Sequence, residues 1–322
     1  MCFREFGIFI FSAGLLPLSI FSQESGDTGQ FAFNFVSDEY AVENTINICT
    51  NSGQIPYQYE AEINMPVCDD TLCANVIIKL FWDLAGNYKG FDTIPGKPLT
   101  KFDHKRFDTA DYQKLDQILK NRNSMLRILN KEDLVDKSVK VKSNVVDAVT
   151  GATPKTIKNS VVEGAVYSSF TLWHFVNGPI KNRLANYTQN IYSEQVARQM
   201  LQSGNYEKQL FALRKMSEKD YESQSELLFE VIGQSAPLIK AYIITKAPLP
   251  FSNNEKNRQF VALFPALDDY SKSIFLNRIT TEKELAPVFL PLFLSMFNEL
   301  NNKQQELITS ACQKFEIPGV KE

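Results

Sequence analysis

The stretch Ala74-Asn-Val-Ile-Ile-Lys-Leu-Phe-Trp-Asp83 is the strongest β-strand signal in the chain. Successive side chains of a strand point to opposite faces, so every second residue from Val76 to Trp82 shares one apolar face. Ile77 and Phe81 place apolar groups on the opposite face, which predicts that both faces of this strand are covered. A turn is expected directly afterwards, over residues 85–90.

Further elements are expected on both sides of this strand. Residues 57–64 alternate and predict the preceding strand, whereas residues 23–54 are rich in polar residues and predict a flexible entry with at most one strand. After residue 100 we expect a helix capped by Asp108 or Thr109, with an apolar stripe from Tyr112 to Leu119.

Three elements are expected between this helix and residue 180. Residues 124–129 predict a short helix, and the alternating residues 135–146 predict a strand. Residues 154–176 predict a long helix, because apolar side chains recur every three or four positions. Thr153 stands where its N-cap belongs and Pro154 at its first position, while Asn177-Gly178-Pro179 predicts its end.

From Ile180 onward the sequence predicts successive amphipathic helices with short polar breaks. Their expected spans are 193–203, 206–216, 222–233, 236–246, 255–267, 270–279, 285–299 and 302–315. Paired helices of this length favour an α-solenoid of the HEAT or armadillo kind, with an irregular helical bundle as the alternative. The predicted fold is therefore an α+β domain followed by an all-α helical-repeat domain.

The first 22 residues differ from the rest of the chain. Residues 6–21 carry no charge and are about as long as the core of a signal peptide, which is short for a membrane span. We expect an exported protein that begins near Gln23, in the periplasm or cell envelope; a retained N-terminal anchor is the alternative. The chain has 322 residues, a net charge of -3 and no long basic stripe, which argues against nucleic-acid binding.

Four cysteines follow the predicted signal peptide, an even number that suits an oxidising compartment. Cys68 and Cys73 are separated by four residues, which permits a disulfide; free thiols and a redox-active pair are the alternatives. The chain has only two histidines, His104 in an expected exposed loop and His174 in an expected packed helix end. So few histidines argue against a zinc site or a nucleophilic triad.

A strand, a turn and a helix that starts at Thr-Pro would together form an anion-binding arrangement. The first N–H groups of a helix lack partners, and the helix dipole places partial positive charge there. A phosphate near Thr153 would meet these groups, the hydroxyl of Thr156 and the ammonium groups of Lys155 and Lys158. The simpler alternative is that Thr153 only caps a helix.

The same stretch, Asp147-Ala-Val-Thr-Gly-Ala-Thr153, resembles the flavinylation motif of the FMN-binding domain family. This family includes the flavin subunits of sodium-pumping quinone reductases and of Rnf-type complexes. Its motif reads Asp, two variable residues, Ser or Thr, Gly or Ser, Ala, Thr, and every fixed position matches here. The last Thr of the motif receives FMN through a phosphoester bond, installed from FAD by a magnesium-dependent flavin transferase.

The resemblance implies that Thr153 accepts FMN and that Asp147 is a recognition residue. Thr150, Gly151 and Ala152 would shape the turn, and Thr156 fits the Ser or Thr that the family has shortly after its motif. Side chains considered for contact with the flavin ring, each also a plausible core residue, are Trp82, Tyr88, Phe91, Phe102, Tyr167 and Trp173. The resulting organisation is a signal peptide at 1–22, a flexible segment at 23–54, an FMN-binding domain at 55–178 and a helical-repeat domain at 179–322.

These observations predict an exported electron-transfer flavoprotein whose helical domain docks a redox protein partner, with any membrane association provided by such a partner. The first alternative is an exported helical scaffold with a flavin-free FMN-like module. A second alternative is an enzyme that uses bound FMN on a small substrate. The chemistry of a flavin carrier would reside in the cofactor, and the protein would supply its position and surroundings.

Overall fold

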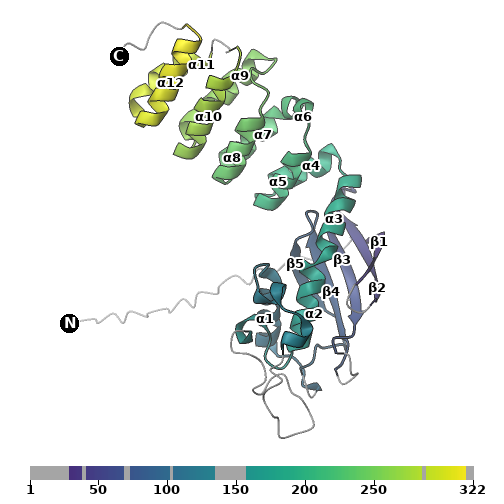
Figure 1. The fold of residues 1–322 in the computed structure, drawn as a ribbon. Helices are drawn as coiled ribbons and strands as arrows, with labels where there is room; N and C mark the ends of the chain where they lie inside the picture. The colour runs from purple at the N-terminus through teal and green to yellow at the C-terminus, as the bar shows by residue number, and fades with distance from the viewer. Residues whose placement is uncertain are drawn as a thin grey trace, which may run out of the picture.

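The structure is a computed structural model that describes residues 29–37, 41–68, 73–101, 104–134, 157–284 and 288–316. A five-stranded antiparallel sheet comes first and a helical region follows it (Figure 1). This order agrees with an α+β part followed by an all-α part. The expected signal peptide at 1–22 and the expected strand at 135–146 lie outside the described residues.

The sheet is a simple meander in which each strand pairs with its neighbour along the chain. The strands are β1 (Gln30–Val36), β2 (Glu43–Thr50), β3 (Pro56–Met65), β4 (Val76–Asp83) and β5 (Tyr88–Thr93). The expected strands at 57–64 and 74–83 are therefore confirmed as β3 and β4. The expectation of at most one strand before residue 55 is wrong, because both β1 and β2 precede it.

Within the part of the chain that the structure describes, strand β4 is fully buried on one face only. Its residues Val76, Ile78, Leu80 and Trp82 are buried, as the alternation predicts. On the opposite face Ile77 and Phe81 are only half-buried, and Lys79 lies over the ring of Phe81 with its ammonium 5.6 Å from the ring centroid. The prediction that both faces of this strand are covered is wrong; an antiparallel sheet with one solvated face explains the pattern.

Three helices cover the buried face of the sheet: α1 (Thr109–Lys120), α2 (Val166–Asn177) and α3 (Pro179–Asn190) (Figure 1). Asp108 caps α1 through a capping box with Asp111, which confirms the expected start of this helix. The short helix expected at 124–129 is a 3₁₀ turn, Met125–Ile128, capped by Ser124.

Helix α2 packs beside α1 and satisfies backbone groups at the end of that helix. The last four carbonyls of a helix have no partner within it. Asn177 Nδ2 donates to the carbonyl of Leu119, 3.0 Å away, and Trp173 Nε1 donates to that of Asn121 at 2.9 Å. The sheet satisfies a carbonyl of α2 in the same way: Trp82 Nε1 donates to Val176 O, in the last turn of α2, at 3.2 Å.

The prediction of one long helix over residues 154–176 is wrong for the residues before Val166 that the structure describes. Residues 157–165 contain a short 3₁₀ turn, Lys158–Ser160, and extended backbone at Val161, and α2 starts only at Val166. Gly164 has a φ of +83°, in the left-handed region that glycine adopts most easily. The N-cap of α2 is Ala165, so the prediction that Thr153 caps the helix ending near residue 176 is wrong.

Helix α3 packs against the sheet, although the helical domain was expected to begin at residue 179. Thr188 Oγ1 donates to the carbonyl of Leu84 at 2.6 Å, so it accepts from the hydroxyl of Tyr59, 2.7 Å away. The ring of Tyr187 packs against Phe33 and Tyr59, with centroid separations of 5.3 and 6.1 Å.

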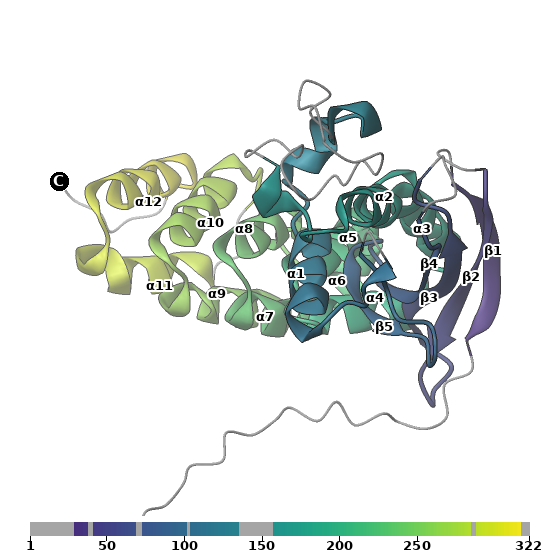
Figure 2. The same ribbon diagram turned by 90° about the horizontal axis from the view of Figure 1, so that it is seen from below.

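Beyond α3, helices stack in two layers that extend away from the sheet (Figures 1 and 2). One layer consists of α4 (Glu194–Gln202), α7 (Ser225–Gln234), α9 (Asn254–Ala262) and α11 (Phe289–Met296). The other consists of α5 (Tyr206–Lys215), α8 (Pro237–Lys246), α10 (Asp269–Thr281) and α12 (Asn302–Lys314). The short helix α6 (Glu218–Ser223) lies between α5 and α7. Helices of the second layer begin about every 32 residues, which is typical of repeat architectures.

Local sequence explains most of these helix boundaries. Ser193, Asn205, Ser217, Asn253, Asp268 and Asn301 each cap the helix that follows through a side-chain oxygen. Aromatic packing joins the hairpins: Phe260 stacks on Phe275 with centroids 4.7 Å apart, and Phe264 packs against Phe275 at 5.3 Å. Each helix pair thus buries its apolar face against the next pair.

Candidate functional site

The motif and its surroundings

All six expected cofactor-binding residues lie outside the described residues: Asp147, Thr150, Gly151, Ala152, Thr153 and Thr156. The two residues that bracket this segment are described and fully buried. Leu134 ends a 3₁₀ turn, Lys131–Leu134, and is 0% exposed, while Ile157 is 3% exposed. Both belong to the core formed with the sheet. The segment that carries the motif is therefore attached to the core at both ends.

A small apolar and aromatic surface lies beside these attachment points. Met125 and Ile128, at the two ends of one 3₁₀ turn, are 46% and 65% exposed. Residues three apart in such a helix lie on the same side, so these two side chains form one patch. Tyr167 on α2 is half-buried, and the ammonium of Lys131 lies 5.8 Å from its ring centroid. Both 3₁₀ turns contact α2, so these four residues lie on neighbouring elements, and we refer to them together as the Met125–Tyr167 surface.

The polypeptide after the motif is held in place by hydrogen bonds. Ser169 Oγ accepts from the backbone N–H of Val162 at 2.9 Å and donates to the carbonyl of Ala165 at 2.8 Å. Gly164 lies directly against the side chain of Lys101, whose ammonium pairs with Asp111 on α1 at 2.7 Å. Residues 157–165 are thereby fixed against α1 and α2 despite the absence of an α-helix there.

The aromatic candidates for ring contact differ in accessibility. Trp82 and Trp173 are core residues, 0% and 4% exposed. Tyr88 is half-buried and donates to Asp116 Oδ1 at 3.1 Å, and Phe91 packs against Tyr112 with centroids 6.1 Å apart. Phe102 lies outside the described residues. Tyr167 is the half-buried candidate that contacts an element flanking the motif.

The two histidines are placed as the sequence predicts. His104 is exposed and has a φ of +58°. His174 packs against Phe170, with ring centroids 4.2 Å apart, and its Nε2 lies 2.9 Å from the carbonyl oxygen of Leu126. Among the described residues no cluster of histidine, cysteine and acidic side chains suits a metal ion.

Cysteines

Cys68 and Cys73 form a disulfide, with their Cα atoms 5.7 Å apart, so the free-thiol alternative for this pair is wrong. Cys49 and Cys312 are buried free thiols. Burial, together with the nearby negative charge of Glu60, raises the pKa of Cys49 to about 12. Burial also raises the pKa of Cys312. A thiol must lose its proton to react, so these two positions are unsuited to redox chemistry.

We therefore expect Cys49 to resist alkylation in the folded protein. With a pKa near 12, very little of the Cys49 thiol is deprotonated at pH 8. Its rate of alkylation should therefore be at least about a hundredfold lower than in the unfolded chain. Peptide mapping by mass spectrometry after iodoacetamide treatment, with and without denaturant, measures both rates. Equal labelling in the two conditions would contradict this burial.

Comparisons with known proteins

Within the described residues no helix has both the length and the apolar character needed to cross a membrane. No protein-family model matches this sequence, and searches of curated proteins and of solved structures returned no match.

Proposed function

We propose that this protein is an exported electron-transfer flavoprotein that carries FMN on Thr153. The observation that carries the proposal is the agreement of Asp147-Ala-Val-Thr-Gly-Ala-Thr153 with every fixed position of the flavinylation motif. Attachment would break the phosphoanhydride bond of FAD and form a phosphoester bond to Thr153 Oγ. The hydroxyl would lose its proton, and AMP would leave.

The late start of α2 changes how the cofactor would be retained. A helix that began at Pro154 would have offered its dipole and free N–H groups to the phosphate. Because α2 begins at Val166, its N-terminus does not provide this non-covalent affinity at Thr153. A covalent phosphoester makes such affinity unnecessary, which suits a compartment where free flavin is diluted.

The Met125–Tyr167 surface supports the proposal by its chemistry. A flavin needs an apolar or aromatic surface for its ring system, and the protein tunes the ring through neighbouring charges. The exposed pair Met125 and Ile128 supplies the apolar area, and Lys131 supplies a positive charge beside the ring of Tyr167. Leu134 anchors the start of the motif segment only a few residues from this surface. The disulfide between Cys68 and Cys73 agrees with an extracytoplasmic location.

The two-layered helical region would dock a redox protein partner, as an α-solenoid of the HEAT or armadillo kind. Stacked helical hairpins present an extended surface formed by the same positions of successive repeats. The regular spacing of α5, α8, α10 and α12 supports this reading. The same feature favours the second candidate function, an exported scaffold whose sheet domain carries no flavin.

Visible absorbance after co-expression with a flavin transferase separates these two functions. The flavoprotein account predicts a yellow protein whose flavin absorbance survives denaturation and gel filtration. Thr153→Val should abolish this absorbance, because valine keeps the shape of threonine but removes the acceptor oxygen. Thr281→Val, at an exposed position at the end of α10, is the matched control and should retain bound flavin, since it removes a threonine hydroxyl outside the motif and its flanking segment.

A host in which a known flavinylated domain becomes yellow establishes that the transferase is active. A colourless wild-type protein from that host would support the scaffold. Absorbance that persists in Thr153→Val would show that the acceptor is a different residue.

A further inference from the structure

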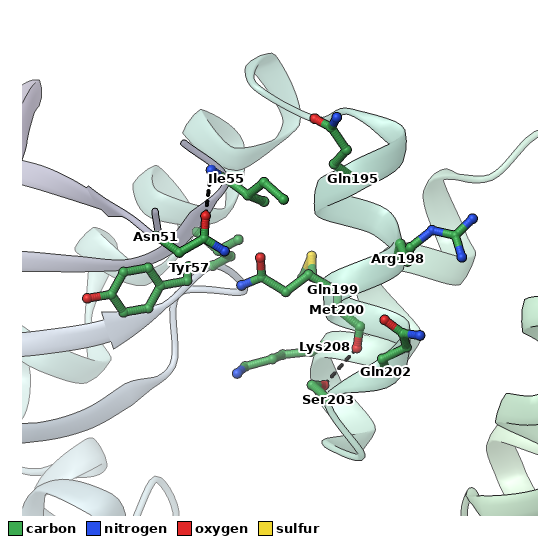
Figure 3. Close-up of a pocket in the computed structure, with 11 residues that line it drawn as sticks. Asn51, Ile55, Tyr57, Gln195, Arg198, Gln199, Met200, Gln202, Ser203 and Lys208 are labelled. Carbon is green, nitrogen blue, oxygen red and sulfur yellow. Dashed lines mark hydrogen bonds between the residues drawn. The ribbon is translucent and has the colours of Figure 1, made fainter. Parts of the chain in front are cut away.

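A cleft separates the sheet from the first helical hairpin, remote in sequence from the flavinylation motif (Figure 3). Its volume is about 430 Å³, within the range of small-molecule sites. The wall on the sheet side is the β2–β3 turn with Asn51, Ile55 and Tyr57, and the opposite wall is α4 with Gln199 and Met200. Lys208, in the first turn of α5, extends across the cleft toward Tyr57 (Figure 3).

The lining is rich in hydrogen-bond donors, and none of the described residues that form it is acidic. It includes two cations, Arg198 and Lys208. Glu207, the acid adjacent to Lys208 in sequence, forms an ion pair with Arg122 and so does not neutralise Lys208. Arg198 is exposed and points away from the sheet, so of these two lining cations Lys208 is the one that faces Tyr57 (Figure 3).

Asn51 is held in one orientation by the turn that it closes. Its Oδ1 accepts from the backbone N–H groups of Gly53 and Ile55, each 3.0 Å away. Because the oxygen is committed to the turn, the amide nitrogen of Asn51 is left as a donor at the cleft. Gln199 extends its amide nitrogen, a second donor, toward the same space (Figure 3).

The position of Lys208 adds to the positive potential. The N-terminus of a helix carries partial positive charge, so a lysine in the first turn is electrostatically unfavourable unless an anion is near. Lys89 is a second positive charge beside the cleft, with its ammonium 5.9 Å from the ring centroid of Tyr57. Burial lowers the pKa of Lys89, and the charge of Lys208 lowers it further.

We propose that this cleft binds a small oxyanion ligand, a phosphate or carboxylate compound, with Lys208 as its charge partner and Asn51 and Gln199 as neutral donors. The tyrosine ring and Met200 provide apolar surface for the remainder of the ligand. This inference is independent of the flavin, because none of the lining residues belongs to the motif segment.

Calorimetric titration of the full chain at low ionic strength tests the proposal, with pyrophosphate and citrate as probes and glucose as a neutral control. We expect saturable binding of at least one anion, weakened by salt, and none of glucose. Preference for pyrophosphate would identify a phosphate ligand, and preference for citrate a carboxylate ligand. Failure of both anions to bind at up to about 10 mM would overturn the proposal.

Two variants locate the binding. Lys208→Gln should weaken it at least about tenfold, the value of one charge-assisted hydrogen bond. Asn51→Asp keeps both acceptor contacts of the turn but replaces the donor by a negative charge, and it should weaken binding at least as much. Lys219→Gln, at an exposed position on α6, is the matched control and should leave affinity unchanged. Anion binding that Lys208→Gln and Asn51→Asp leave intact would place the site elsewhere and refute this assignment.

Discussion

Replacing Trp82 with alanine should lower the free energy of unfolding of the sheet part by about 3–5 kcal/mol. Trp82 is 0% exposed, lies on the face of β4 covered by helices, and packs against Phe175 with ring centroids 6.2 Å apart. Its indole N–H also satisfies the carbonyl of Val176, in the last turn of α2. The variant therefore creates a large cavity and removes the partner of a buried carbonyl.

Phe81→Ala is the control for this prediction, because the adjacent residue is also a large aromatic but is half-buried on the opposite face. We expect it to cost only about 1 kcal/mol. Urea denaturation followed by far-UV circular dichroism measures both variants. If the two substitutions had equal effects, α2 and α3 would not cover the face of the sheet described here.

Gly86→Ala should destabilise the protein by about 2–4 kcal/mol through a clash between the β4–β5 turn and α3. Gly86 has a φ of +79°, which is strained for alanine. A Cβ at this position would overlap the backbone carbonyl oxygen of Lys181, in the first turn of α3. The turn has little freedom to yield, since Asp83 Oδ1 accepts from the N–H groups of both Ala85 and Asn87 at 2.9 Å.

Gly96→Ala is the control that distinguishes backbone strain at a positive φ from the steric overlap with α3. Gly96 has a φ of +74°, but no atom of the described residues lies within 4 Å of the position that its Cβ would take. Its substitution should cost only the strain, about 1 kcal/mol. Thermal or urea denaturation of the pair gives the comparison, and equal losses would mean that α3 does not contact the turn.

The strands that sequence reasoning found and missed differ in composition. Strand β4 was predictable because four apolar side chains alternate along it. Strand β2, Glu43–Thr50, was missed because its outward positions carry Glu43, Thr45 and Asn47. Polar residues on the solvated face of an antiparallel strand look like loop residues when read without their strand partners.

Residues 154–176 show that a helical spacing of apolar residues does not by itself establish an α-helix. The helical pattern correctly predicts that Ile157, Val161, Val162 and Ala165 are buried. The segment that contains these residues, however, is not an α-helix. Gly164 was the available signal, because glycine inside a helix costs about 1 kcal/mol relative to alanine. The helical region was predicted far better, since capping residues and amphipathic spacing indicate the same boundaries there.

The two candidate sites differ in how far sequence could define them. The proposal that Thr153 is the flavin acceptor rests on a short contiguous motif. The oxyanion cleft could not be identified from sequence, because Asn51, Gln199 and Lys208 come from a strand turn and two helices far apart in the chain. Only the docking of the first helical hairpin against the β2–β3 turn brings these three residues together (Figure 3).

The intact mass of the exported protein tests the central claim most directly. Protein from a host that expresses the flavin transferase should be heavier than protein from a host without it by one FMN less one water, with the increase confined to the peptide that contains Thr153. Identical masses from the two hosts, with the transferase shown to be active, would contradict the flavoprotein account.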